Sequence, residues 1–134
     1  MKIVAYLMLS GNCEEALNFY KEVLNGEIVF LQRYKDAVGM PVADEDKEKV
    51  LHAQLEFGEN KLYFSDSNKH QPLKVGNNVS LTLEFEDEGE QQRVFDLLAK
   101  DGQVQMPLED QFWGAKFGSV IDKFGFYWSL NCNK

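Results

Sequence analysis

The spacing of hydrophobic residues along this chain alternates between a strand-like and a helix-like period. The same order of strand and helix patterns occurs in each half of the chain. The first half begins with an apolar strand pattern at 3–9 and continues with a helical pattern at 13–25, where apolar residues recur on one face. Alternating patterns typical of half-buried strands follow at 27–34, 50–57 and 61–65. The first half therefore predicts a βαβββ unit.

The second half repeats this order. A strand pattern at 79–86 precedes a helix that starts after Asp87 and ends at Gly102, and strand patterns follow at 103–106, 117–121 and 126–131. A turn-rich segment lies between the halves. We therefore expect a single domain over 1–134, made of modules 1–66 and 78–134 that are joined by a linker at 67–77.

Both predicted helices begin with a capping-box pattern, in which a short polar residue precedes a Glu by three positions. Asn12 and Glu15 form this pattern in the first module, and Asp87 and Glu90 form it in the second. We expect each side chain to cap the backbone of its own helix.

Both tryptophans and several other aromatic residues are concentrated at 112–130. A Trp-Gly pair starts this segment, the sequence Asp122-Lys123-Phe124-Gly125 predicts a turn, and Trp128 lies in the last strand, where we expect it to be core. The segment resembles the C-terminal signature of the PhnB-like branch of the glyoxalase, or vicinal oxygen chelate, superfamily. Lys123 and Phe126 depart from that signature, which usually has Pro and often has His there. Further matching pieces are 11–20, His52-Ala53, Ser65-Asp66 and Trp113-Gly114.

This resemblance implies an α+β fold in which duplicated βαβββ modules form an open eight-stranded barrel-like cleft. Superfamily enzymes hold a divalent metal there with His, Gln or Glu side chains, and that metal chelates two substrate oxygens. The corresponding positions in this chain lie near Ala5, Tyr63, Ser80 and Ser129, which are not metal ligands. We therefore expect no metal and no other cofactor.

His52 is the one histidine inside a predicted strand. Gln54 and Glu56 share its face, because side chains alternate along a strand. His52 and Gln54 are accordingly the catalytic candidates, as part of a stripe that could act in acid–base chemistry or bind a metal. The alternative is a hydrogen-bonded strand histidine with no functional role. His70, in the linker, is expected to be exposed.

Aromatic residues are the candidates for a ligand-binding cleft. They include a loop tryptophan beside Gly114, which has less reason to be core than a tryptophan on a strand. Filling the core is the alternative role for this group. Lys116 and Arg33 are the basic residues nearest to it, and either could hold an anionic head group. The candidate ligand-binding residues are Trp113, Phe112, Phe117, Tyr6, Tyr63 and Lys116.

Composition excludes several classes of partner. The chain has 134 residues, of which 44% are hydrophobic, and a net charge of −8, which repels nucleic acid and anionic membranes. Apolar runs are too short to span a bilayer and no secretory signal is present, so we expect a cytoplasmic protein. Two cysteines are too few for a disulfide framework. Cys13, at a helix start, is either a thiol of lowered pKa or simply a small residue.

Two classes of function follow. The first is a metal-free module that binds a small, partly apolar molecule, and the second is a metal-dependent lyase, isomerase or dioxygenase of the glyoxalase type. Relatives also carry a ubiquinone-pathway methyltransferase label, but no strand is followed by a Gly-rich loop that could cradle S-adenosylmethionine. We expect a homodimer, since family members commonly pair and an open cleft leaves strand edges to cover.

Overall fold

The computed structural model describes residues 1–134, which form two compact units, Met1–Lys74 and Val75–Lys134. The boundary between them falls inside the predicted linker at 67–77. Each unit contains one α-helix and one open four-stranded sheet, so the predicted α+β class and the duplicated βαβββ order are confirmed. Neither α-helix is long and apolar enough to cross a membrane.

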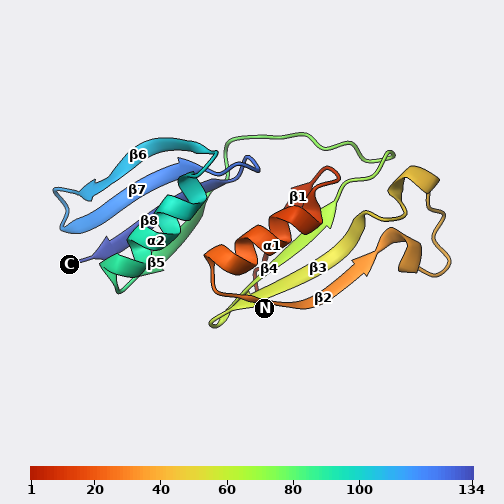
Figure 1. The fold of residues 1–134 in the computed structure, drawn as a ribbon, viewed down its shortest axis with the longest axis horizontal. Helices are drawn as coiled ribbons and strands as arrows, with labels where there is room; N and C mark the ends of the chain where they lie inside the picture. Colours follow the sequence, from red (N-terminus) through yellow and green to blue (C-terminus); the bar gives the residue numbers. More distant parts are fainter. The chain divides into compact units, whose positions relative to one another are not determined.

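The first unit builds its sheet in the order β1-β4-β3-β2 (Figure 1). Strand β1 runs parallel to β4, whereas the β4–β3 and β3–β2 pairs are antiparallel. Two short 3-10 helices, η1 (Tyr34–Asp36) and η2 (Asp44–Asp46), lie in the long connection between β2 and β3. The elements are β1 (Ala5–Leu9), α1 (Cys13–Val23), β2 (Glu27–Arg33), β3 (Val50–Phe57) and β4 (Asn60–Asp66).

The second unit repeats this topology in the order β5-β8-β7-β6. Strand β6 reaches Asp110, beyond the predicted end at 106, although Pro107 lies inside it. An edge strand tolerates proline because one side of its backbone has no partner strand, and the pairing with β7 shifts register here. The elements are β5 (Leu81–Phe85), α2 (Glu88–Ala99), β6 (Gln103–Asp110), β7 (Ala115–Ile121) and β8 (Tyr127–Asn133).

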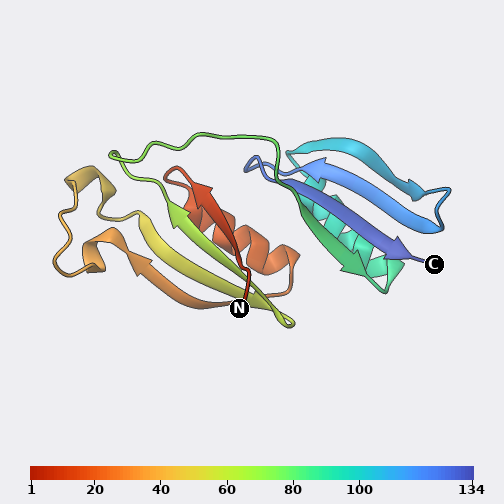
Figure 2. The same cartoon turned by 180° about the vertical axis from the view of Figure 1, so that it is seen from behind.

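Each helix covers one face of its own sheet, as opposite views of the ribbon show (Figures 1 and 2). In the first unit the buried core between helix and sheet includes Leu7, Leu17, Tyr20, Leu55 and Phe64. Because side chains alternate along a strand, the residues between these core positions lie on the opposite face. We call this the helix-free face of the first sheet; it carries Tyr6, Met8, Phe30, His52, Gln54 and Tyr63.

The start of helix α1 is capped from a distant strand. The Asn12 side chain makes no capping hydrogen bond, so the capping box predicted here is wrong. Instead the buried carboxylate of Asp66, at the end of β4, accepts hydrogen bonds from the backbone N–H groups of Gly11 (2.8 Å) and Cys13 (3.0 Å). Its other oxygen accepts from Val50 N–H at 2.9 Å. The N–H groups that Asp66 binds are not the Glu15 N–H that a capping box would use, so Asp66 holds this helix start in a different way.

Asp122 holds the predicted turn in the second unit. One oxygen of this buried carboxylate accepts from the backbone N–H groups of Phe124 (2.9 Å) and Phe126 (3.1 Å), and Gly125 has the positive φ of 91° that this turn requires. The other oxygen accepts from the indole N–H of Trp128 at 2.8 Å. Trp128 is 2% exposed, so its predicted core position is confirmed.

The predicted cap of helix α2 is also present, since the Asp87 side chain accepts from Glu90 N–H at 2.8 Å. Aspartate at this position satisfies one of the free N–H groups of the first helical turn.

Candidate functional site

Four rings gather on the helix-free face of the first sheet. Tyr6 and Tyr63 are direct neighbours across the β1–β4 pair, and their ring centroids are 5.6 Å apart. The His52 ring lies 5.5 Å from Tyr6 and 5.1 Å from Tyr63, and Phe30 lies 5.8 Å from His52. We call these four residues the aromatic platform. Tyr6 and Phe30 remain 45% and 44% exposed, so the platform has surface to offer a ligand.

His52 is hydrogen-bonded at both ring nitrogens. Its Nδ1 lies 2.5 Å from the Tyr6 hydroxyl oxygen, and its Nε2 lies 3.1 Å from Nε2 of Gln54. The two catalytic candidates therefore do lie side by side, on the face that the period of β3 predicted. Partial burial raises the pKa of Tyr6, so its hydroxyl keeps its proton at neutral pH.

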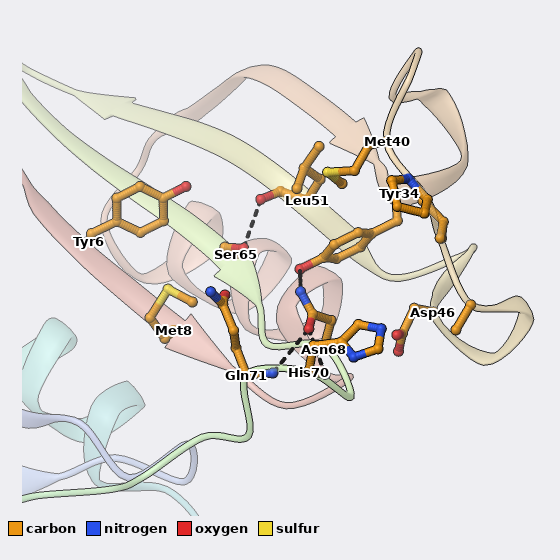
Figure 3. Close-up of a pocket in the computed structure, with 13 residues that line it drawn as sticks. Tyr6, Met8, Tyr34, Met40, Asp46, Leu51, Ser65, Asn68, His70 and Gln71 are labelled. Atoms are coloured by element: carbon orange, nitrogen blue, oxygen red, sulfur yellow. Dashed lines mark hydrogen bonds between the residues drawn. The ribbon is translucent and has the colours of Figure 1, made fainter.

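A pocket of about 450 Å³ adjoins the platform at Tyr6 (Figure 3). Met8 and Ser65 form part of its floor on the helix-free face. Residues 40–43, in the connection between β2 and β3, form a mostly apolar wall, and residues 68, 70 and 71, in the predicted linker, form another. The pocket therefore lies entirely within the first unit.

Hydrogen bonds hold the wall of this pocket in place. The Tyr34 hydroxyl donates to the backbone oxygen of Asp66 at 2.7 Å and accepts from the Asn68 amide at 3.4 Å. The Ser65 hydroxyl donates to the backbone oxygen of Leu51 at 2.7 Å. These bonds fix polar side chains in the floor and wall of the pocket, whereas the apolar side chains of its lining remain available for contact with a ligand.

Asp46 is the acidic residue that lines the pocket, and it is paired with a lysine. Lys49 Nζ lies 2.9 Å from its carboxylate, and this hydrogen bond lowers the pKa of Asp46. His70, exposed as predicted, also lines the pocket and acts electrostatically on Asp46. No lysine or arginine is among the lining residues.

A second aromatic group lies in the second unit, where β6 turns into β7. The Trp113 ring is 5.2 Å from Phe112 and 5.8 Å from Phe117. Phe112 is 97% exposed and Trp113 is 51% exposed, so these loop residues are not core. The six predicted ligand-binding residues thus fall into two sets, one in each unit.

The basic candidates are engaged in ion pairs. Lys116 is paired in register with the buried Cys132, on the helix side of the second sheet, and lies 3.6 Å from Glu88. Arg33 donates to Glu14 at 2.9 Å and to the backbone oxygen of Glu48 at 2.9 Å. Neither is brought to the aromatic platform.

The residues at the family's metal positions do not fit a divalent cation. Tyr63 is opposite Tyr6 rather than Ala5, whose neighbour is Leu62. In the second unit Ser129 is opposite Thr82, since β5 begins after Ser80. No group of three or more His, Cys, Asp or Glu side chains in the structure could hold a metal ion.

Cys13 is a buried core residue. Burial raises the pKa of its thiol, and the nearby carboxylate of Asp66 raises it further. The alternative of a thiol with a lowered pKa is therefore wrong, because burial and Asp66 outweigh the helix N-terminus.

Sequence reasoning did not find the pocket. Its signal was the uncharged, mostly apolar stretch at 37–43, inside a connection whose other residues are mostly charged. Contiguous apolar residues are unusual in an exposed loop unless they pack against another part of the protein or bind a ligand.

Comparison with known proteins gives a family match over almost the whole chain and a similar protein from Escherichia coli. The chain matches the family model of 3-demethylubiquinone-9 3-methyltransferase over residues 1–131. Protein YjdN of Escherichia coli is 29% identical, with 100% of this chain and 97% of YjdN covered.

Solved structures agree with this match. Protein PA1353 of Pseudomonas aeruginosa has a TM-score of 0.91 and 38% identity, covering 99% of this chain and 98% of its own. A PhnB protein of Bacillus cereus, described as a putative 3-demethylubiquinone-9 3-methyltransferase, has a TM-score of 0.82 and 33% identity, with 98% and 99% covered. The fosfomycin resistance protein FosX of Listeria monocytogenes, at 9% identity, shares the fold (TM-score 0.67, with 100% and 94% covered). The chain thus belongs to the 3-demethylubiquinone-9 3-methyltransferase family, the PhnB-like branch of the glyoxalase superfamily.

Proposed function

We propose that this protein binds a small, planar, partly apolar molecule on the aromatic platform and in the adjoining pocket of its first unit. The observation that carries this proposal is the continuity of the two features through Tyr6. That residue contributes a ring to the platform and also lines the pocket of about 450 Å³. A volume of this size suits a small organic ligand.

Apolar burial supplies the affinity in this proposal. The platform rings are partly exposed, and Met8 and Met40, at 39% exposure each, add flexible thioethers that adapt to a ligand's outline. Flat molecules stack well on such rings, and a central aromatic anchor contributes ~2 kcal/mol or more of binding free energy. No metal is needed to orient oxygens of the ligand.

Replacing one ring of each aromatic group tests this proposal. Aromatic fragments that bind the purified protein are first found by ligand-observed NMR. We expect Tyr63→Ala to weaken a hit by ~2 kcal/mol, roughly thirtyfold, and Trp113→Ala to change its affinity less than twofold. Thermal unfolding of each variant controls for folding. Loss of affinity in Trp113→Ala alone would instead assign the site to Phe112, Trp113 and Phe117.

A second candidate function is proton transfer to or from the bound molecule. The 2.5 Å contact between Tyr6 and His52 favours it, because a histidine held by a hydrogen bond is the commonest general acid or base. His52→Ala would then abolish turnover of a substrate with binding reduced far less. Equal losses of turnover and binding would reduce His52 to a platform residue.

We further propose that the protein is a cytoplasmic homodimer without nucleic-acid or membrane partners. Edge strands β2 and β6 support the dimer, because Val29 and Val104 are 42% and 45% exposed on them. Light scattering should give twice the mass of one chain. The mass of a single chain at micromolar concentration would contradict the dimer.

A further inference from the structure

We infer that the ligand of this site carries a neutral hydrogen-bond acceptor, such as the carbonyl oxygen of an aromatic ketone or amide, and that the Tyr6 hydroxyl donates to it. The inference rests on the proposed function, since it names the chemistry of the molecule bound at that site. It comes from the two hydrogen bonds that the His52 ring makes, one with Tyr6 and one with Gln54.

The partner at Nε2 decides where the His52 proton lies. The side-chain nitrogen of Gln54 faces Nε2 at 3.1 Å and has only hydrogens to offer, so Nε2 must accept. A neutral imidazole then carries its proton on Nδ1, which faces the Tyr6 oxygen at 2.5 Å. Nδ1–H therefore donates to Tyr6. Turning the Gln54 amide around would reverse both roles, and the experiment below separates the two arrangements.

In this arrangement His52 does not use the hydroxyl proton of Tyr6, and Ser65 is the other side chain that hydrogen-bonds to Tyr6. Because its oxygen already accepts from His52, Tyr6 can donate that proton to a further group. Partial burial raises the Tyr6 pKa, so the proton is retained at neutral pH. The Ser65 hydroxyl donates its own proton to the backbone oxygen of Leu51 at 2.7 Å, so toward Tyr6 its oxygen can only accept. A ligand acceptor therefore competes with Ser65 for the Tyr6 proton. Tyr6 is thus the donor that the shared edge of platform and pocket presents to a ligand (Figure 3).

Charge around the pocket selects against anionic acceptors. The lining residues include no lysine or arginine, but they do include the carboxylate of Asp46. Lys49, the nearest cation to Asp46, is committed to that carboxylate at 2.9 Å. His70, also in the lining, acts with Lys49 to lower the pKa of Asp46. A carboxylate ligand would lose its hydration without gaining a free cation, whereas a carbonyl loses much less.

Three aromatic probes of similar size test the inference: acetophenone, ethylbenzene and benzoate. Each is titrated by NMR into the unaltered protein, Tyr6→Phe and Tyr127→Phe. The hydroxyl of Tyr6 is removed in the first variant with its ring kept, and Tyr127→Phe is the matched control, at the start of β8 in the second unit and outside the proposed site. We expect acetophenone to bind the unaltered protein about fivefold more tightly than ethylbenzene, and benzoate to bind most weakly.

The variants distinguish the hydrogen bond from general packing. Tyr6→Phe should lower acetophenone affinity about fivefold and leave ethylbenzene unchanged, whereas Tyr127→Phe should change neither by more than twofold. An equal effect of Tyr6→Phe on both probes, or none, would overturn the inference while binding persists and the proposed function stands. Tighter binding of benzoate than of acetophenone would overturn it as well. No binding of any probe would refute the proposed function and the inference together.

Discussion

The two units share one topology but differ in what their helix-free faces present. Strands β1 and β4 bring Tyr6 opposite Tyr63 in the first unit, whereas the corresponding strands β5 and β8 bring Thr82 opposite Ser129 in the second. The long connection at 34–49 also walls a pocket in the first unit, while residues 111–114 form only a short exposed loop in the second.

This difference shows that the shared fold and the chemistry of the site depend on different sets of residues. The core positions under each helix require only apolar side chains, so both units satisfy them. The helix-free face makes no such demand, because its residues contribute little to burial within their own unit. It can therefore differ between the units without loss of the fold.

The largest expected effect on stability distinguishes the two tryptophans of the second unit. Trp128→Ala should lower the free energy of unfolding by ~4 kcal/mol, because it empties a buried site and leaves Asp122 without its indole donor. Trp113→Ala should lower it by less than ~1 kcal/mol, since Trp113 is half-exposed. Urea unfolding of both variants measures the contrast. Equal large losses would make Trp113 an ordinary core residue.

The next largest loss of stability is expected at the two buried carboxylates, one in each unit. Asp66→Asn should lower the free energy of unfolding by ~3 kcal/mol, since an amide has one acceptor oxygen for three backbone N–H groups. Asp122→Asn should cost a similar amount through its own three donors. Chemical denaturation of both variants tests this. A loss below ~1 kcal/mol in either variant would show that water replaces the carboxylate there.

The smallest effect concerns the pH dependence of stability. The folded-state pKa of Cys13 is raised above that of the unfolded thiol, so its contribution is fully present below the unfolded pKa of about 8.5. Above that pH the unfolded chain releases a proton that the folded chain retains, and stability falls. Cys13→Ala should flatten the decline in unfolding free energy between about pH 8.5 and pH 10. An identical decline in that variant would assign it to other groups.

Sequence patterns predicted most of the fold. Apolar periodicity located all eight strands and both helices, because packing a helix on a sheet requires apolar residues at every second strand position and along one face of the helix. The capping box at Asn12 is absent, and the start of the helix is held instead by Asp66, which is too far away in sequence for a local pattern to indicate. The end of β6 was missed because Pro107 is permitted on an edge strand.

The candidate site was predicted in part. The shared face of His52 and Gln54 follows from the strand period. The structure brings Tyr6, a predicted ligand-binding residue, next to His52 and adds Phe30, which was not predicted. Their proximity depends on the strand order β1-β4-β3-β2, which no local pattern contains. The pocket wall at 40–43 depends on the path of a long loop, which hydrophobic periodicity does not describe.

The Asp66 carboxylate also has a consequence for the cooperativity of the first unit. Its donors come from residues 11–13 and from residue 50, while its own strand ends at residue 66, so three distant parts of the chain meet at one side chain. Opening any one of them leaves a buried charge with fewer donors, which penalises partial opening. The amides of Gly11, Cys13 and Val50 should therefore exchange their hydrogens through one shared opening rather than through local fraying of a helix end.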